Sequence, residues 1–420
     1  MSGLTVVEIC AGAGGQALGL ELAGFEHRLA VELDENAAAT LRENRPEWEV
    51  KVGDVADVGV WNPDDYSEGL SLLAGGVPCP PFSIAGKQLG TSDERDLFAW
   101  AIELAGRMQP RALLLENVRG LSMPRFSGYR QHVKDRLAEL GYWSDWKLLE
   151  ARDFGVPQLR PRFILVALRE EDARYFSWPE PTPYIGTVGT ALLDLMKDDE
   201  WPGADAWASQ ADGIAPTIVG GSKKHGGADL GPTRAKRAWA ALGVNGLGID
   251  DAPPTADHDS NYVPKLTTEM VARLQGWGPD PKYRWKFTGR KTSRYRQIGN
   301  AFPPPVARAV GGAIAAALKH EGARKDFAEA EAEALHDPIY LALKDAKRPL
   351  SVQQISKATG GVVGTRDIEQ RLGILSRDFE IKHDGSGDER TYALGAFKGF
   401  IGQEDHLRHA AFEAARSRIS

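Results

Sequence analysis

The sequence predicts an α/β fold built on a mostly parallel sheet, followed by an irregular second domain and a small α+β module. Strand and helix patterns alternate at the start of the chain, which is typical of parallel α/β sheets. This alternation is lost after about residue 170, and residues 177–265 are instead rich in Gly, Pro, Asp and Thr, with short strand-like pieces such as Pro216–Val219 in place of long elements. The 420 residues suffice for two or three domains.

Each expected strand is a short apolar or β-branched run, and each expected helix has apolar residues at helical spacing. The first strand covers 5–10 and ends at the small-residue run Ala11-Gly12-Ala13-Gly14-Gly15. A helix follows, and a second strand, 28–33, has Glu32 near its end. Further strands are expected at 70–74, 112–116 and 163–168, and helices near 97–107, 130–140, 267–274 and 304–318.

The last hundred residues have the outline of a winged helix. Residues 321–334 suit a solvated linker helix. Ser351 and Gln354 form a capping-box pattern that begins a helix, and a second helix is expected over about 366–377. Asp384-Gly385-Ser386-Gly387 then separates two short strands near 379–383 and 390–394.

Composition excludes several classes of protein. Hydrophobic residues make up 42% of the chain and charged residues 26%, as in folded globular proteins. Two cysteines cannot form a disulfide framework or a Cys-rich zinc site. The start of the chain lacks the features of a signal peptide, and no apolar run reaches the ~18 residues of a membrane span. We therefore expect a cytoplasmic protein with no membrane partner. The net charge of −7 argues weakly against a nucleic-acid partner.

The first candidate motif is the glycine-rich turn after the first strand. Gly12, Gly14 and Ala17 fit the loose G-x-G-x-x-A pattern, and Glu32 follows 20 residues after Gly12. Such a turn lets backbone N–H groups approach a nucleotide-like ligand, and the carboxylate suits ribose hydroxyls. The alternative is a turn that serves only close packing of helix and sheet.

The second motif is Pro78-Cys79-Pro80-Pro81. Proline on both sides keeps Cys79 out of a helix, so the thiol should project from a stiff loop at the carboxyl edge of the sheet. Open α/β folds bind their ligands at that edge. The alternative is a buried structural cysteine.

The third motif is Glu116-Asn117-Val118, which follows three leucines. A carboxylate on such an apolar approach is either paired and structural or has a raised pKa suited to acid–base chemistry.

The fourth motif is Arg160-Pro161-Arg162, which enters the strand expected at 163–168. Alternate positions place both guanidinium groups on one face, where they suit phosphate, carboxylate or a base carbonyl. Surface arginines are the alternative.

A fifth motif, Gln297-Ile298-Gly299-Asn300-Ala301, is interpreted as a tight polar turn before the three prolines that open the last helix of the core.

In order and spacing, these motifs together closely resemble the cytosine-C5 DNA methyltransferase family. The match spans roughly residues 4–318 and includes Gly86-Lys87-Gln88 and the run from Leu266 to Trp277. The family usually has Asp-Leu-Phe-Ala-Gly in its first motif, where this chain has Glu8-Ile9-Cys10-Ala11-Gly12. Cys10 therefore replaces the aromatic residue that usually flanks the adenine. Pro80 follows the cysteine where many relatives have Gln.

The resemblance implies a Rossmann-like S-adenosylmethionine-dependent methyltransferase fold, with S-adenosylhomocysteine as product, no metal, and a flipped-out cytosine as substrate. Residues 1–175 and 293–320 would form the catalytic domain, 176–292 the target-recognition domain, and 321–420 the linker helix and winged-helix-like module. Cys79 would attack C6, Glu116 would bind N3 and the exocyclic amine, Arg162 would hold O2, and Arg160 would support the loop or a phosphate. The cofactor residues implied are Cys10, Ala11, Gly12, Gly14, Gly15, Glu32, Leu33, Asp54, Val55, Pro78, Asn300 and Ala301.

Basic residues are concentrated where DNA would lie. Seven of them occur between residues 282 and 296 without an acidic residue, and aromatic residues are interleaved. A one-signed field with aromatics suits a phosphate-lined cleft. The expected DNA contacts are Ser83, Lys87, Gln88, Lys223, Lys224, Arg234, Arg237, Arg290, Lys291, Arg294 and Arg296. The resemblance implies duplex DNA as the partner and a monomer on DNA, in either a restriction–modification or an orphan methylation role; in the first role a restriction endonuclease would be linked only genetically.

Three alternatives remain open at this stage. An RNA (tRNA) cytosine-C5 methyltransferase has the same fold. A dehydrogenase would use the glycine-rich turn but gives no role to Cys79 or Glu116. A DNA-binding regulator would use Arg366, Arg371 and Arg377 of the C-terminal module, where a plain protein-docking role is equally compatible.

Overall fold

The computed structural model describes residues 3–78, 97–182, 186–220, 228–325, 337–376, 378–386 and 390–397. Its main sheet has seven strands in the order β3-β2-β1-β4-β5-β7-β6. The first five of these are parallel, and β7 runs antiparallel to both of its neighbours. The strands are β1 (Leu4–Ile9), β2 (Phe25–Glu32), β3 (Val50–Val52), β4 (Leu72–Gly75), β5 (Ala112–Val118), β6 (Tyr142–Glu150) and β7 (Pro161–Arg169).

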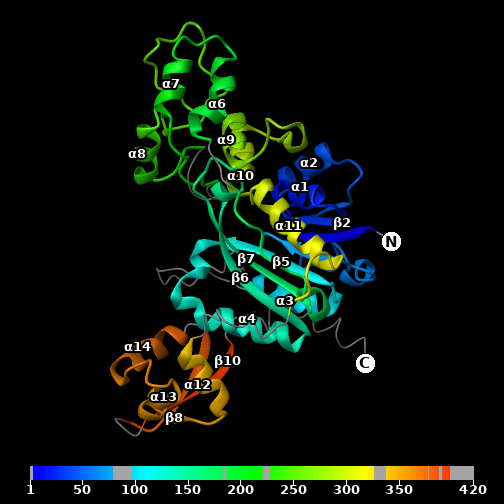
Figure 1. Cartoon of the computed structure of the whole chain (residues 1–420), viewed down its shortest axis with the longest axis vertical. Helices are drawn as coiled ribbons and strands as arrows, with labels where there is room; N and C mark the ends of the chain where they lie inside the picture. The colour runs from blue at the N-terminus through cyan, green and yellow to red at the C-terminus, as the bar shows by residue number, and fades with distance from the viewer. Residues whose placement is uncertain are drawn as a thin grey trace.

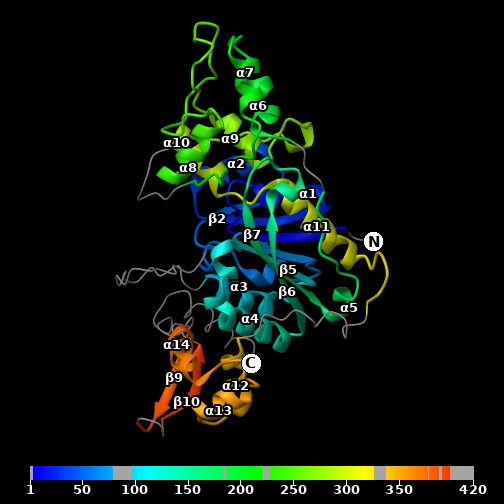
Figure 2. The same cartoon turned by 60° about the vertical axis from the view of Figure 1, so that its left-hand side comes forward.

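Helices cover both faces of this sheet (Figures 1 and 2). Successive strand residues face opposite sides, so Leu72 packs with α11 (Pro304–Leu318) while Leu73 packs with α3 (Leu97–Met108). α1 (Gly15–Leu22) and α2 (Glu35–Asn44) lie on the α11 side, and α4 (Ser127–Glu139) lies on the α3 side. The prediction of a mostly parallel, Rossmann-like α/β fold is confirmed.

Two strands were missed by the sequence pattern. β3 has only three residues, and β6 is an edge strand whose exposed and buried positions do not alternate regularly. An edge strand is covered on one side only, so its sequence carries a weaker apolar signal.

The region after residue 176 contains short helices around its own apolar core. The expectation of a strand at 216–219 is wrong, because Ala215 forms only an isolated bridge with Gln158. Four buried tryptophans at 201, 207, 239 and 277 belong to this core. The helices are α6 (Val188–Lys197), α7 (Ala204–Gln210), α8 (Thr233–Ala241) and α9 (Thr268–Gln275).

The motif interpreted as a tight turn at Gln297 is instead the end of a helix, α10 (Lys291–Asn300). Ala301–Pro303 separates α10 from α11. By length and composition the whole stretch Lys291–Leu318 is apolar enough to cross a membrane, but 61% of its most apolar window is buried inside the protein. That burial is typical of a core helix.

The C-terminal module has the predicted winged-helix order and packs on α4. Its elements are α12 (Pro338–Ala346), β8 (Leu350–Ser351), α13 (Val352–Ala358), α14 (Thr365–Leu375), β9 (Phe379–Asp384) and β10 (Thr391–Phe397), with β10 at the centre of a three-stranded sheet. The capping box of Ser351 and Gln354 is present. The expected linker helix is absent over 321–325, and the rest of it lies outside the described residues. The domain boundaries stay a prediction.

Candidate active site

The carboxyl ends of three parallel neighbours, β1, β4 and β5, meet at one edge of the sheet. Gly75 pairs with Ile9 on one side and with Leu115 on the other. The glycine-rich turn after β1, the segment that leads from β4 towards Cys79, and Glu116 near the end of β5 therefore lie side by side. Antiparallel β7 brings Arg162 to the same edge, opposite Val118. Cys79 itself lies outside the described residues, as do Ser83, Lys87 and Gln88.

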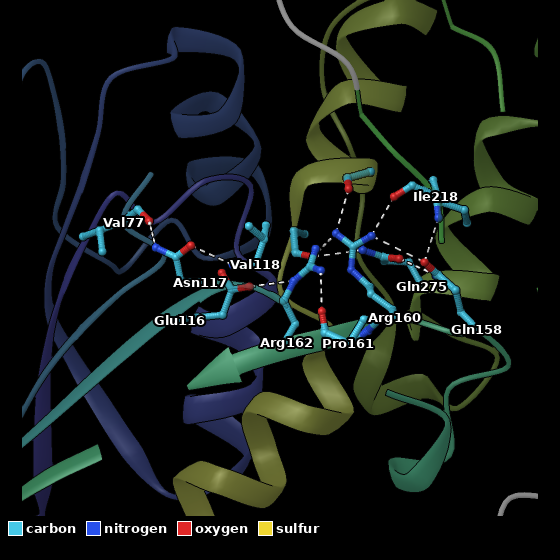
Figure 3. Close-up of polar contacts among 12 residues, drawn as sticks. Val77, Glu116, Asn117, Val118, Gln158, Arg160, Pro161, Arg162, Ile218 and Gln275 are labelled. Carbon is cyan, nitrogen blue, oxygen red and sulfur yellow. Dashed lines mark hydrogen bonds and ion pairs between the residues drawn. The ribbon is translucent and has the colours of Figure 1, made fainter. Parts of the chain in front are cut away.

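Glu116 and Arg162 form a buried ion pair at this edge (Figure 3). The Arg162 Nε to Glu116 Oε1 distance is 2.6 Å, but the N–H is not aimed at the oxygen as in a hydrogen bond. Burial raises the pKa of Glu116, and the positive charges of Arg162 and Arg160 oppose that rise. The site thus favours a proton on Glu116 while keeping a cation in contact with it.

Asn117 fixes the segment that leads to Cys79. Its Nδ2 donates to the Val77 carbonyl at 3.3 Å, and its Oδ1 accepts from Val118 N–H at 2.8 Å (Figure 3). The backbone two residues before Cys79 is therefore held beside Glu116. Pro78 follows directly and is half-buried.

Arg160 lies in the interior and is only 1% exposed. Its Nη1 donates to the Ile218 carbonyl at 2.6 Å, and its Nη2 donates to the carbonyls of Gly299 and Ala301 at 2.7 and 2.9 Å (Figure 3). It cannot reach a phosphate from this position, so that alternative of the prediction is wrong. Arg160 instead joins β7 to the segment around Ile218 and to the end of α10.

The glycine-rich turn has a left-handed backbone at three positions. The φ angles are 51° at Cys10, 56° at Gly12 and 94° at Gly14. Glu32 closes the turn from β2, because its Oε2 accepts from Gly12 N–H at 2.7 Å and its Oε1 accepts from Asp34 N–H at 2.8 Å. Burial raises the pKa of Glu32, and these backbone hydrogen bonds oppose the rise.

The other residues expected at the cofactor lie around this turn or near it. Leu33 is 68% exposed, an unusual position for a leucine, while Val55 is buried. The Asp54 carboxylate accepts from Ala56 N–H at 3.0 Å. A Cβ on Gly15 would lie 3.0 Å from the Cβ of Ala301, so that residue closes on the first turn of α1. Asn300 is exposed and packs against Gly220.

Comparison with known proteins assigns the fold and the family. The profile of the C-5 cytosine-specific DNA methylase family matches residues 4–316. The type II methyltransferase M.NaeI of Lentzea aerocolonigenes is 61% identical over 420 residues, covering all of both chains. M.NgoMIV of Neisseria gonorrhoeae is 51% identical over 321 residues, which are 76% of this chain and 99% of that protein. The chain belongs to the C-5 cytosine-specific DNA methylase family.

A solved structure agrees with this assignment at the level of the fold alone. A variant of Spodoptera frugiperda DNMT2 matches with a TM-score of 0.51 and 17% identity, covering 74% of this chain and 99% of that one. Family membership makes the protein a DNA (cytosine-5-)-methyltransferase. The family match ends at residue 316, before the C-terminal module.

In the basic segment of this methylase, residues 282–296, some of the cations are paired with acidic side chains from other parts of the chain. Lys291 pairs with Asp251 at 3.0 Å, and Lys286 pairs with Glu43 of α2. Arg290 is exposed, and Arg294 and Arg296 are half-buried, each with a buried Nε that has no hydrogen-bond partner. Arg234 and Arg237 are exposed on α8, while Lys223 and Lys224 lie outside the described residues.

Two glutamines that the sequence motifs do not identify, Gln158 and Gln275, hold the backbone segments that surround the site. Gln158 Oε1 accepts from Ile218 N–H at 2.9 Å, and Gln275 Nε2 donates to the Ala301 carbonyl at 2.9 Å. Both side chains are fully buried. The sequence does contain an indication for Gln158, because this residue precedes Arg160 by two positions and its side chain therefore lies on the same face of the chain.

A cavity of about 630 Å³ lies at the opposite edge of the sheet, where Arg169 ends β7, and it is lined also by Tyr175 and His320. It is not part of this site. Among the described residues, no group of three or more His, Cys, Asp or Glu side chains could hold a metal ion.

Proposed function

We propose that this DNA (cytosine-5-)-methyltransferase modifies a flipped-out cytosine in one specific duplex sequence through a covalent bond between Cys79 and C6. The buried Glu116–Arg162 pair carries the proposal, because it places an acid and a cation beside the segment that leads to Cys79. A base inside the duplex stack does not expose C5 and C6 to an enzyme, so the cytosine must leave the stack.

The residues at the glycine-rich turn fit S-adenosylmethionine. A Cβ on Gly12 would meet no atom within 4 Å, so the turn has open space beside it, and exposed Leu33 offers an apolar surface next to Glu32. Glu32 is half-buried and already holds two backbone N–H groups, which positions it to share its carboxylate with a ribose hydroxyl. The cofactor, when bound, supplies an electrophilic methyl group. The turn, Leu33, Asp54, Val55, Pro78, Asn300 and Ala301 would hold it.

The chain's own residues activate C5. The Cys79 thiolate adds to C6, and the electron pair of the C5–C6 double bond becomes available at C5. Glu116 donates to N3 in its protonated form, which burial favours by raising its pKa, and its other oxygen accepts from the exocyclic amine. Arg162 donates to O2 and stabilises the charge that develops on the ring. After C5 is methylated, loss of its proton restores the double bond and expels Cys79.

The biological role proposed is modification of DNA in a restriction–modification system. M.NaeI and M.NgoMIV are both named type II methyltransferases, which supports that role. The proposal includes a cytoplasmic location, action as a monomer on duplex DNA, and genetic linkage to a restriction endonuclease. Arg234, Arg237, Arg290, Lys291, Arg294 and Arg296 would contact the phosphates. No finding favours RNA as the substrate.

A mechanism-based trap tests the covalent step. In the presence of S-adenosylmethionine, duplex DNA carrying 5-fluorocytosine at the methylated position should form a stable adduct with the protein, because after methylation of C5 the fluorine cannot leave as a proton does. The position is found first by bisulfite mapping of DNA from cells that express the protein. Cys79→Ser should form no adduct and show no methyl transfer, while its DNA affinity stays measurable. Turnover near the wild-type rate in Cys79→Ser would contradict the assignment.

A further inference from the structure

The segment Arg284–Thr288, which lies within the proposed target-recognition domain, alternates between exposed and half-buried side chains from Arg284 to Phe287. Arg284 and Lys286 are exposed, whereas Trp285 and Phe287 are half-buried. Both aromatic residues pack against the core of the irregular region. Phe287 lies edge-on against Trp277 with ring centroids 4.9 Å apart. Trp285 also reaches the glycine-rich turn and packs against the small cluster that contains Ala11, Ala17 and Leu41.

Trp285 contacts the turn at its most constrained point. Its indole N–H donates to the Ala13 carbonyl at 2.7 Å. Ala13 lies between Gly12 and Gly14, both with positive φ. A Cβ on Gly14 would lie only 2.5 Å from the indole ring, so glycine is required there for the contact to exist. The indole therefore packs against the proposed cofactor turn.

The same segment is bound along α2, the helix that follows Glu32. The backbone N–H of Lys286 donates to Asn44 Oδ1, and Asn44 Nδ2 donates to the Lys286 carbonyl, each at 2.8 Å. Thr288 N–H donates to Thr40 Oγ1 at 2.9 Å. The segment thus joins the glycine-rich turn of the proposed cofactor site to α2, the helix that begins shortly after Glu32 and Leu33.

The segment is also joined to the basic helix α10. Gln297 of α10 donates from Nε2 to the Thr288 carbonyl at 3.0 Å and accepts from Thr40 Oγ1 at 2.6 Å. Arg290, at the start of α10, is exposed. The basic residues of α10 that are proposed to contact DNA therefore belong to the same hydrogen-bonded unit as the Trp285 indole, which contacts the glycine-rich turn.

We propose that Trp285 is a positioning residue that couples DNA binding to cofactor binding. This inference rests on the proposed function, since it takes the turn as the cofactor site and Arg290 as a phosphate contact. DNA and cofactor each stabilise the placement of the 284–288 segment in which Trp285 contacts Ala13. Binding of one ligand then favours binding of the other, and linkage requires the two effects to be equal.

Calorimetric titration of S-adenosylhomocysteine, with and without a duplex that carries the mapped site, tests the coupling. In the wild-type protein, DNA should tighten S-adenosylhomocysteine binding at least about fivefold, the lower range of ordinary coupling. Trp285→Phe keeps an aromatic ring but loses the N–H donor. It should weaken cofactor binding about fivefold without DNA, as expected for one lost hydrogen bond, and reduce the DNA effect to less than about twofold.

Phe287→Leu is the matched control, because it removes a half-buried aromatic from the same segment without touching the turn. It should lower the melting temperature yet keep the wild-type coupling. Wild-type coupling in Trp285→Phe, an equal loss of coupling in Phe287→Leu, or no coupling in the wild-type protein would each overturn the proposal. Absence of any S-adenosylhomocysteine binding to the wild-type protein would instead contradict the proposed function.

Discussion

Glu116 and Arg160 are both buried charged residues, but their surroundings give them different capacities. Arg160 has its two terminal nitrogens on backbone carbonyls, so no terminal group remains for a ligand. Glu116 has an ion pair through Oε1, and its other oxygen lies near the backbone of Gly76 at the open edge of the sheet. Burial combined with spare hydrogen-bonding capacity is what distinguishes a reactive carboxyl from a structural one.

The raised pKa of Glu116 predicts an alkaline loss of activity. The protonated form is the one that donates to N3, so methyl transfer should fall as the pH rises through this pKa. Glu116→Gln cannot ionise and should lose that alkaline limb, while its turnover drops by roughly 10²–10⁴-fold because it is a poor proton donor. Single-turnover rates between pH 5 and about pH 9 measure both effects. An unchanged pH profile in the variant would rule out Glu116 as the titrating group.

At the scale of elements, the glycine-rich turn depends on contacts from three separate parts of the chain. Glu32 of β2 holds Gly12, Trp285 holds Ala13, and Ala301 and Phe302 close on Gly15. These partners are 20, 272 and about 286 residues away in sequence. The loop therefore takes its shape from long-range packing as well as from its glycines.

Alanine at two of these glycines should separate stability from cofactor binding. Gly14→Ala places a Cβ against the indole and should lower the free energy of unfolding by about 3 kcal/mol, a large overpacking effect. Gly12→Ala meets no neighbour and should cost only about 1 kcal/mol from its positive φ. Its methyl group would, however, enter the space proposed for the cofactor and weaken S-adenosylhomocysteine about tenfold.

Urea unfolding and calorimetry measure the two quantities on the same samples. Equal destabilisation by the two substitutions would show that the indole does not confine Gly14. Unchanged cofactor affinity in Gly12→Ala would place the ligand elsewhere.

At the scale of the whole molecule, the C-terminal module is attached to the catalytic domain through α4 (Figure 1). Asp135 of α4 accepts from the Tyr340 hydroxyl at 2.8 Å and pairs with Lys344 at 2.6 Å. His132 stacks on Phe397 with ring centroids 4.5 Å apart. A shared apolar and polar interface of this kind fixes the module as part of the folded protein. Arg371 is exposed on α14, whereas Arg377 and the side chain of Arg366 lie outside the described residues, so a DNA-binding role for the module stays a prediction.

Asp135→Asn should loosen this attachment. Burial tends to raise the pKa of Asp135, but hydrogen bonds from Lys344, Gln131 and Tyr340 outweigh it and lower the pKa below 3.8. The ionised form is therefore stabilised by folding, so its contribution is present above pH 3.8 and is lost as the pH falls through the lowered pKa. The variant should mimic that loss at neutral pH, at about 1–2 kcal/mol.

Amide hydrogen exchange in α12 measures the effect at neutral pH. Glu139→Gln, on the same helix but with its exposed carboxylate paired to Arg136, is the control and should leave α12 protected. Equal exchange in both variants would mean that Asp135 does not hold the module.

Local sequence patterns predict some elements of this fold correctly and misassign others. The first strand, which ends at Ile9, the capping box at Ser351 and the Pro-rich start of α11 follow local rules, and each forms where the pattern predicts. The sequence pattern assigns Gln297 to a turn, but the residue lies in α10, where it hydrogen-bonds with Thr40, 257 residues away along the chain, and with Thr288, 9 residues away in the preceding loop. Pattern rules do not register partners at such separations.

The sequence by itself determined the parallel α/β order, the family, and the types of side chain at the carboxyl edge of the sheet, since motif order and local periodicity are properties of the chain. Tertiary structure alone decided which of two neighbouring arginines faces the site. Arg160 and Arg162 have the same chemistry, and only the carbonyls of Ile218, Gly299 and Ala301 make the first structural. It also decided that Trp285 holds the glycine-rich turn, because the direction of a side chain depends on what the rest of the chain packs against it.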